Sequence, residues 1–124
     1  MTPINKHIAR MYEYLGVAYA ATNNDEKAVE CFNKVREMAP LWATPICHMG
    51  SLLIKRNELD KALGVYYEAR QSPFYGTEEV VVTGGKKYVR KGFKNIIEKR
   101  IDFLEDKIKR GYIFSTQKGW IKKR

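Results

Sequence analysis

An internal repeat with a period of thirty-four residues constrains the fold of this chain more than any other feature. Residues 12–40 align with residues 46–74, so that Gly16 matches Gly50 and Phe32 matches Tyr66. Self-similarity at such a period is typical of proteins built from stacked supersecondary units. Because glycine recurs at the same place in both units, we expect neighbouring helices to approach each other closely at Gly16 and Gly50.

Each repeat unit has the pattern of two helices joined by a short turn. Apolar residues recur at helical spacing on both sides of Asn23 and Asn57, and asparagine tolerates the left-handed conformation in which many helices end. Pro40 and Pro73 follow the second helix of each unit, and proline cannot continue a helix interior. Residues 1–76 are therefore predicted to form two helical hairpins, and the fold class is predicted to be mainly α.

The two units resemble the tetratricopeptide repeat (TPR) family, with repeats at residues 9–42 and 43–76. In the first unit, the family's signature places hold Tyr12, Leu15, Gly16, Tyr19, Ala28, Phe32 and Pro40. The second unit fits through Ile46, Met49, Gly50, Leu53, Ala62, Tyr66 and Ala69, although its proline falls one residue early. The resemblance implies a short α-solenoid that serves as a scaffold and has a concave groove lined by the first helix of each unit.

Eight residues would line the groove that this resemblance implies. They are Arg10, Glu13, Val17, Thr44, Cys47, His48, Ser51 and Lys55. The expected partner is a peptide or helix of another protein, or a second copy of the chain. Co-chaperones of the family clamp a terminal carboxylate with basic and amide groups, but Glu13 and Cys47 occupy such places here, so that ligand is not expected. The simpler alternative is that the eight residues merely face solvent.

The sequence offers little for catalysis, metal binding or a cofactor. Cys47 and His48 are neighbours in a predicted helix, where successive side chains point about 100° apart, so they are not expected to meet as nucleophile and base. The two cysteines and two histidines show no C-x-x-C or H-x-x-x-H spacing. We therefore expect a non-catalytic protein with reduced cysteines, no metal and no cofactor.

Residues 77–91, TEEVVVTGGKKYVRK, interrupt the helical pattern. Two adjacent glycines would cost a helix roughly 2 kcal/mol relative to alanine, and the valines add to this cost. A β-hairpin insertion is favoured instead, with Gly84-Gly85 as a two-residue turn in which both positions take positive φ. The expected register pairs Thr83 with Lys86 and continues outward, without a break, to Glu78 opposite Lys91.

Helical periodicity returns in residues 92–110. The expected apolar stripe consists of Phe93, Ile96, Ile97, Ile101, Leu104 and Ile108. Since a stack of two repeats leaves an apolar side uncovered, this helix is expected to cap it within the same domain. Residues 111–124 are predicted to be a basic, aromatic tail, which suits stacking on single-stranded nucleic acid and equally suits docking on the protein's own core or on a partner.

The net charge of +9 lies almost entirely in residues 77–124, which carry fourteen Lys and Arg against six Asp and Glu. The candidate contacts to an anionic partner are Lys86, Lys87, Arg90, Lys91, Lys94, Lys122, Lys123 and Arg124. We expect a protein–protein interaction adaptor that uses the groove and the basic hairpin within a larger assembly. The alternative is a nucleic-acid-associated protein that binds through this basic third of the chain.

The expected location is cytoplasmic, without membrane contact. No apolar run approaches the ~18 residues that a membrane span needs. The N-terminal segment, MTPINKHIAR, lacks the apolar stretch of a secretory signal.

Overall fold

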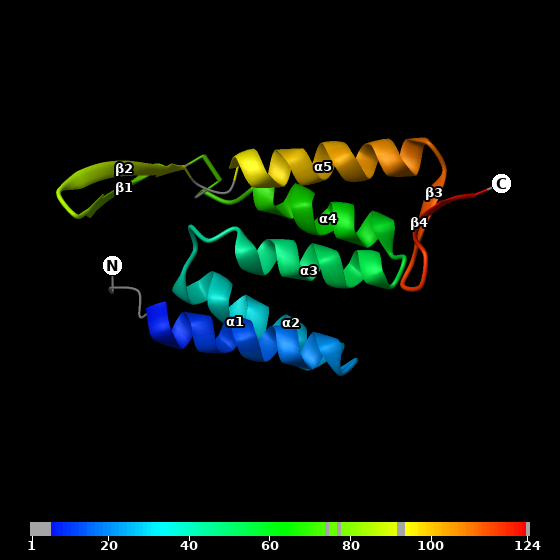
Figure 1. The fold of residues 1–124 in the computed structure, drawn as a ribbon, viewed down its shortest axis with the longest axis horizontal. Coiled ribbons are helices and arrows are strands. Elements are labelled where there is room, and N and C mark those ends of the chain that lie inside the picture. The colour runs from blue at the N-terminus through cyan, green and yellow to red at the C-terminus, as the bar shows by residue number, and fades with distance from the viewer. Residues whose placement is uncertain (1–5, 74, 77, 92–93, 124) are drawn as a thin grey trace.

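Helices make up most of the described chain, and two β-hairpins extend from them (Figure 1). The computed structural model describes residues 6–73, 75–76, 78–91 and 94–123. The helices are α1 (Lys6–Ala21), α2 (Asp25–Met38), α3 (Thr44–Lys55), α4 (Leu59–Arg70) and α5 (Lys94–Lys109). The strands are β1 (Glu78–Thr83), β2 (Lys86–Lys91), β3 (Tyr112–Ser115) and β4 (Gly119–Lys122). The described residues are thus mainly α-helical, as predicted.

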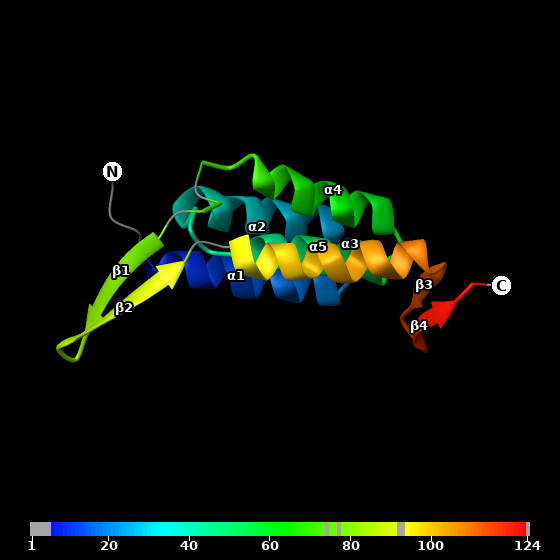
Figure 2. The ribbon, with the colours of Figure 1, turned by 90° about the horizontal axis from the view of Figure 1, so that it is seen from above.

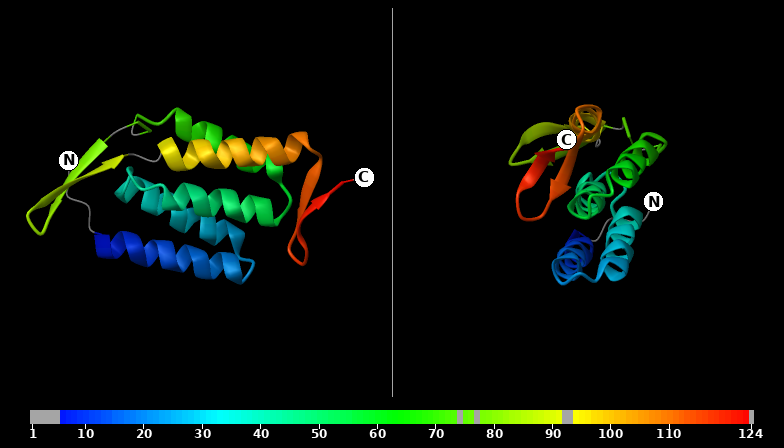
Figure 3. Two further views of the ribbon diagram at one scale, coloured as in Figure 1. Left: turned by 45° about the horizontal axis from the view of Figure 1, so that its top comes forward. Right: turned by 90° about the vertical axis from the view of Figure 1, so that its right-hand side faces the viewer.

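The helices form two layers. α1, α3 and α5 lie in one layer, and α2 and α4 lie in the other (Figures 2 and 3). Each helix contacts the next one along the chain, from α1 to α5. The stack therefore begins with α1 and α2 at one end and finishes with α5 at the other (Figure 3).

The turns inside the two helical hairpins follow the prediction made for asparagine. Asn23, between α1 and α2, has a φ of 61°, and Asn57, between α3 and α4, has a φ of 59°. Asparagine adopts this left-handed conformation more readily than most residues do. Both predicted helix ends are confirmed.

Glycine permits close helix contact inside each hairpin, as predicted. A Cβ atom on Gly16 would lie 2.6 Å from Phe32 Cε1, and one on Gly50 would lie 2.2 Å from Tyr66 Oη. Real Cβ atoms do not approach heavy atoms so closely. The aromatic rings of α2 and α4 therefore rest directly on the glycine backbones of α1 and α3.

α5 covers the apolar side of α3 and α4. Ile97, Ile101 and Leu104 are fully buried in one cluster with residues of those two helices. The predicted stripe is wrong at Ile96, whose exposed fraction is 50%. Ile96 lies about 100° around the helix from Ile97, beyond the edge of the contact with α4. Phe93, also predicted in the stripe, lies outside the described residues.

Polar contacts join α4 and the segment after it to α5. The Arg70 guanidinium donates two hydrogen bonds to the Glu98 carboxylate, of 2.9 and 3.1 Å, and Tyr75 Oη donates a third to the same group. These donors hold the pKa of Glu98 below its usual range, with Arg70 as the larger cause. Burial and the Glu98 carboxylate raise the pKa of Tyr75 to about 12.

Glu98 makes the stability of the fold dependent on pH. Its folded pKa is depressed, so its contribution is present above the unfolded value of about 4.3 and is lost as the pH falls through the folded pKa. We expect Glu98→Gln to unfold at lower urea concentration than wild type near neutral pH. The difference between the two urea midpoints should become smaller below about pH 4, where Glu98 of the wild type takes up a proton. Asp102→Asn, on the exposed side of α5, is the control, and a gap that stays constant with pH contradicts the prediction.

The first β-hairpin has the predicted register at all six pairs, from Glu78–Lys91 to Thr83–Lys86. Gly84 and Gly85 both have positive φ, 61° and 77°, as a two-residue turn of this kind requires. The hairpin projects away from the helices (Figures 1 and 2). Val82 and Tyr88 are 64% and 54% exposed, so this arm presents apolar as well as basic side chains to its surroundings.

Residues 112–122 form a second hairpin, which corrects the prediction of a tail after residue 110. β3 and β4 pair from Tyr112–Lys122 to Ser115–Gly119 across a three-residue loop, and Gly119 has a φ of 75°. Phe114 N donates a hydrogen bond of 2.9 Å to Asn57 Oδ1, and Trp120 packs against the core cluster that contains α5. Of the roles left open for this segment, docking on the protein's own core is the one observed.

Candidate functional site

The predicted groove residues lie on α1 and α3, which share a layer. Five are exposed: Arg10, Val17, Thr44, Ser51 and Lys55. Cys47 and His48 are partly buried. Glu13 is only 6% exposed, so the prediction that it faces a partner is wrong.

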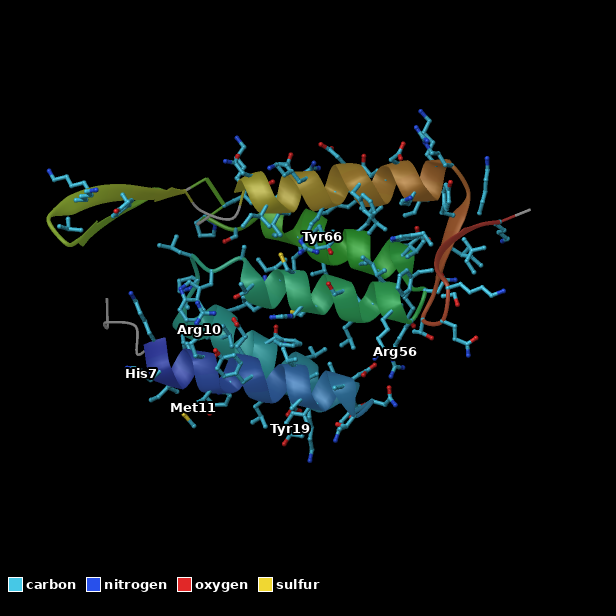
Figure 4. All side chains as sticks on the ribbon, viewed as in Figure 1. His7, Arg10, Met11, Tyr19, Arg56 and Tyr66 are labelled. Carbon is cyan, nitrogen blue, oxygen red and sulfur yellow. The ribbon has the colours of Figure 1, made fainter. Side chains whose placement is uncertain are left out.

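Glu13 is buried because it joins α1 to α3. Its carboxylate accepts a 2.6 Å hydrogen bond from Thr44 Oγ1 and a 2.9 Å hydrogen bond from Arg10 Nη1. Arg10, which Figure 4 labels, in turn lies over the Trp42 ring, with its guanidinium carbon 4.2 Å from the ring centroid. Burying a carboxylate is unfavourable unless it is paired, and these donors supply the pairing. Glu13, Thr44 and Arg10 therefore fasten the two repeat units together.

The side chains of Cys47 and His48 point in different directions, because neighbouring residues on a helix are about 100° apart around its axis. The His48 ring stacks on Phe32 of α2, with centroids 5.2 Å apart and planes 15° apart. Cys47 packs against the cluster containing α5. Burial raises the pKa of the Cys47 thiol, and the nearby Arg100 guanidinium only partly offsets this rise. A thiol with a raised pKa stays protonated at neutral pH and is a weak nucleophile.

A cavity of about 420 Å³ opens between α3, α4, α5 and β4. We call it the α5 pocket. Its apolar lining consists of Ile54, Ile96, Phe103, Leu104 and Trp120. Its polar lining consists of Tyr66, Lys99 and Arg100, with no acidic residue. Its volume lies within the range of about 300–1,000 Å³ typical of ligand sites.

Tyr66, at the base of the pocket, is fully buried (Figure 4). Its Oη atom has no hydrogen-bond partner of normal geometry among the described residues. Burial raises the pKa of this phenol, and the Arg100 guanidinium lies close enough to offset part of the rise. A buried hydroxyl without a partner costs about 1–3 kcal/mol. Such an unpaired group is uncommon in folded proteins and calls for a reason.

Aromatic contacts hold the outer wall of the α5 pocket in place. The Trp120 ring makes edge contacts with Phe103 at 5.7 Å and with Phe114 at 5.3 Å between centroids. Lys107 Nζ lies 4.3 Å from the centroid of Tyr112 and also faces the Phe103 and Trp120 rings. The second hairpin is thereby fixed on α5, so its rings pack within the protein.

The basic residues predicted to meet an anionic partner do not form a single patch. Lys86 and Lys87 lie at the tip of the first hairpin, whereas Lys122 and Lys123 lie at the far end of the molecule (Figure 1). α5, which is about 24 Å long at about 1.5 Å per residue, lies between these two groups. Lys94 begins α5 on the side of the first hairpin. The side chains of Arg90 and Lys91, and all of Arg124, lie outside the described residues.

Neither a metal centre nor a membrane span emerges from the described part of the chain. Within it, no three His, Cys, Asp or Glu side chains come together in a way that could hold a metal ion. Its helices are too short or too polar to cross a bilayer. The α5 pocket differs from the slightly larger cavity beside Trp42, of about 440 Å³, in that no acidic residue lines it.

Comparisons with known proteins add no further identification. No protein-family model matches the chain. Neither the curated proteins nor the solved structures gave a match.

The residues of the α5 pocket were absent from the set of predicted site residues. The sequence assigns Tyr66 only to a signature place of the second repeat, and Trp120 only to the tail. Arg100 contributes to the sequence analysis only through the net charge. Its position directly before Ile101, in the apolar stripe of α5, is the sequence feature that could have indicated a partly buried cation. The pocket combines four separate elements, and no sequence motif joins them.

Proposed function

We propose that this chain is a non-catalytic protein-interaction adaptor whose helices form a short TPR-like solenoid. The thirty-four-residue repeat and the two layers of helices support the TPR likeness. The layer of α1, α3 and α5 would receive a segment of a partner protein, and the eight predicted groove residues remain candidates for this contact, except Glu13. The first hairpin would serve as a second, basic arm.

One observation carries this proposal above all: large apolar residues are exposed along α1, at the open end of the stack. Met11 and Tyr14 are 67% and 69% exposed, and Ile8, Leu15 and Val17 are each more than 40% exposed. Clustered exposure of this kind marks surfaces that bind other proteins. Single exposed apolar residues would need no such explanation, but these share one helix.

Affinity purification of the intact protein from its native source tests the proposal. We expect Met11→Glu with Tyr14→Glu to lose the recovered partner, because the substitution places charge on the apolar face. Lys34→Glu, on the exposed side of α2, should retain it. Replacement of residues 78–91 by a short linker shows whether the hairpin contributes. Equal recovery by the α1 variant and wild type, with no higher oligomer in sedimentation, contradicts a binding role for α1.

The alternative of nucleic-acid association now rests on fewer residues. Lys86 and Lys87 are exposed at the tip of the projecting hairpin, where a phosphate backbone could meet them. The aromatic residues expected to stack on bases instead pack against each other and against α5. For this reason we rank protein binding above nucleic-acid binding.

A further inference from the structure

Two polar groups of the α5 pocket, Tyr66 and Arg100, have no acidic partner among the described residues that line it. Tyr66 Oη is buried without a hydrogen bond of normal geometry among the described residues. Arg100 borders the same cavity. The ion pairs that arginines form within the described residues involve other arginines, and Arg100 takes part in none of them. The planar guanidinium of Arg100 offers several N–H donors whose geometry matches one carboxylate.

The apolar walls add a second requirement for whatever fills the pocket. Ile96 and Phe103 stand on its open side with about half of their surface exposed. A carboxylate alone would leave these residues in water. An occupant that covers them must carry a large apolar group next to its acidic group.

We propose that the α5 pocket binds an acidic side chain and an adjacent large apolar side chain from a segment of a partner protein. The carboxylate pairs with Arg100, whose guanidinium lies next to the buried Tyr66, while the apolar residue packs on Phe103 and Ile96. This inference rests on the proposed adaptor function and names the partner's chemistry. The net charge of +9 favours an acidic partner and speeds its approach.

A selection of short, phage-displayed random peptides on the immobilised full chain tests this proposal. Recovered peptides should carry Asp or Glu beside a large apolar residue. For one such peptide, we expect Arg100→Gln to raise Kd about tenfold. Changing the peptide's acidic residue to its amide should raise Kd by the same factor, with no further loss when both changes are combined. Arg110→Gln removes the same charge just after α5, outside the pocket, and should leave Kd within about twofold.

Tyr66→Phe separates binding from folding. Removal of the buried hydroxyl, which lies next to the Arg100 guanidinium, should raise Kd several-fold by releasing Arg100 from its position. It should not lower the urea midpoint, because the hydroxyl makes no hydrogen bond of normal geometry with a described residue. A variant that fails only through misfolding would raise Kd and also lower the urea midpoint. Phe103→Ala should weaken binding through the apolar half of the site.

Several outcomes would overturn the assignment of the pocket. They are recovery of no peptide, recovery of peptides without an acidic preference, and equal effects of the two arginine substitutions. Binding of decanoate at lower concentration than any recovered peptide would assign the pocket to a free carboxylate amphiphile and would also overturn it. If Arg100→Gln still captures the partner that binds through α1, only the assignment of the pocket is overturned. If the α1 substitutions also leave capture unchanged, the proposed adaptor function is overturned as well.

Discussion

Ile101→Ala is expected to lower the free energy of unfolding by about 2–5 kcal/mol, the range for truncating a fully buried isoleucine. Ile101 is wholly buried between α5 and the helices that α5 covers. The substitution leaves a cavity in the contact that closes this end of the stack. Urea unfolding followed by far-UV circular dichroism measures the change, and wild type and variant should share one slope with denaturant if unfolding stays cooperative.

Ile96→Ala provides a matched control on the same helix. It removes the same atoms from a side chain that is half exposed and borders the α5 pocket. We expect it to cost under about 1 kcal/mol, because little of the side chain leaves a packed environment. Equal losses at the two positions would mean that α5 does not seat its Ile97–Ile101–Leu104 face on α3 and α4.

Gly50→Ala should lower the free energy of unfolding by about 1–3 kcal/mol, the usual cost of overpacking. The added Cβ atom would lie 2.2 Å from Tyr66 Oη and 2.4 Å from Tyr66 Cζ. The tyrosine is fully buried, so its ring cannot move away without displacing its neighbours. Because alanine by itself favours a helix over glycine by up to about 1 kcal/mol, a loss here reports the clash directly.

Gly64→Ala is the control for that helix propensity. Gly64 lies within α4, is exposed, and has no neighbour within 4 Å of an added Cβ atom. We expect this variant to gain about 0.5–1 kcal/mol in stability. The two substitutions should thus act with opposite signs in thermal or urea unfolding. A stabilising Gly50→Ala would show that α3 and α4 do not approach as closely as described.

The features that sequence could predict are those determined by residues near one another in the chain. The Gly84-Gly85 turn determines the pairing of β1 with β2, because a two-residue loop leaves one register for the flanking strands. Asn23 and Asn57 mark the turns between helices through their own conformational preference. The repeated glycines indicate close helix contact for a reason that is equally local.

The features that sequence could not predict depend on residues distant in the chain. Glu13 carries a charge, and charged residues usually lie at the surface. Its burial is made favourable by a hydrogen bond from Thr44, which lies thirty-one positions later in the chain. The second hairpin was not predicted, because its strands are only four residues long and a short loop ending at Gly119 is the one turn signal between them. The α5 pocket exists only once that hairpin places Trp120 beside α5.

The two ends of the helix stack differ, and this difference restricts how copies of the chain can associate. The outer side of α1 is apolar, whereas the outer side of α5 carries the exposed residues Asn95, Asp102 and Asp106. Self-association through α1 would therefore join two identical surfaces about a twofold axis and close after two copies. A head-to-tail filament would have to place the apolar side of α1 on Asp102 and Asp106 of α5, which would take these carboxylates out of water without giving them a new partner.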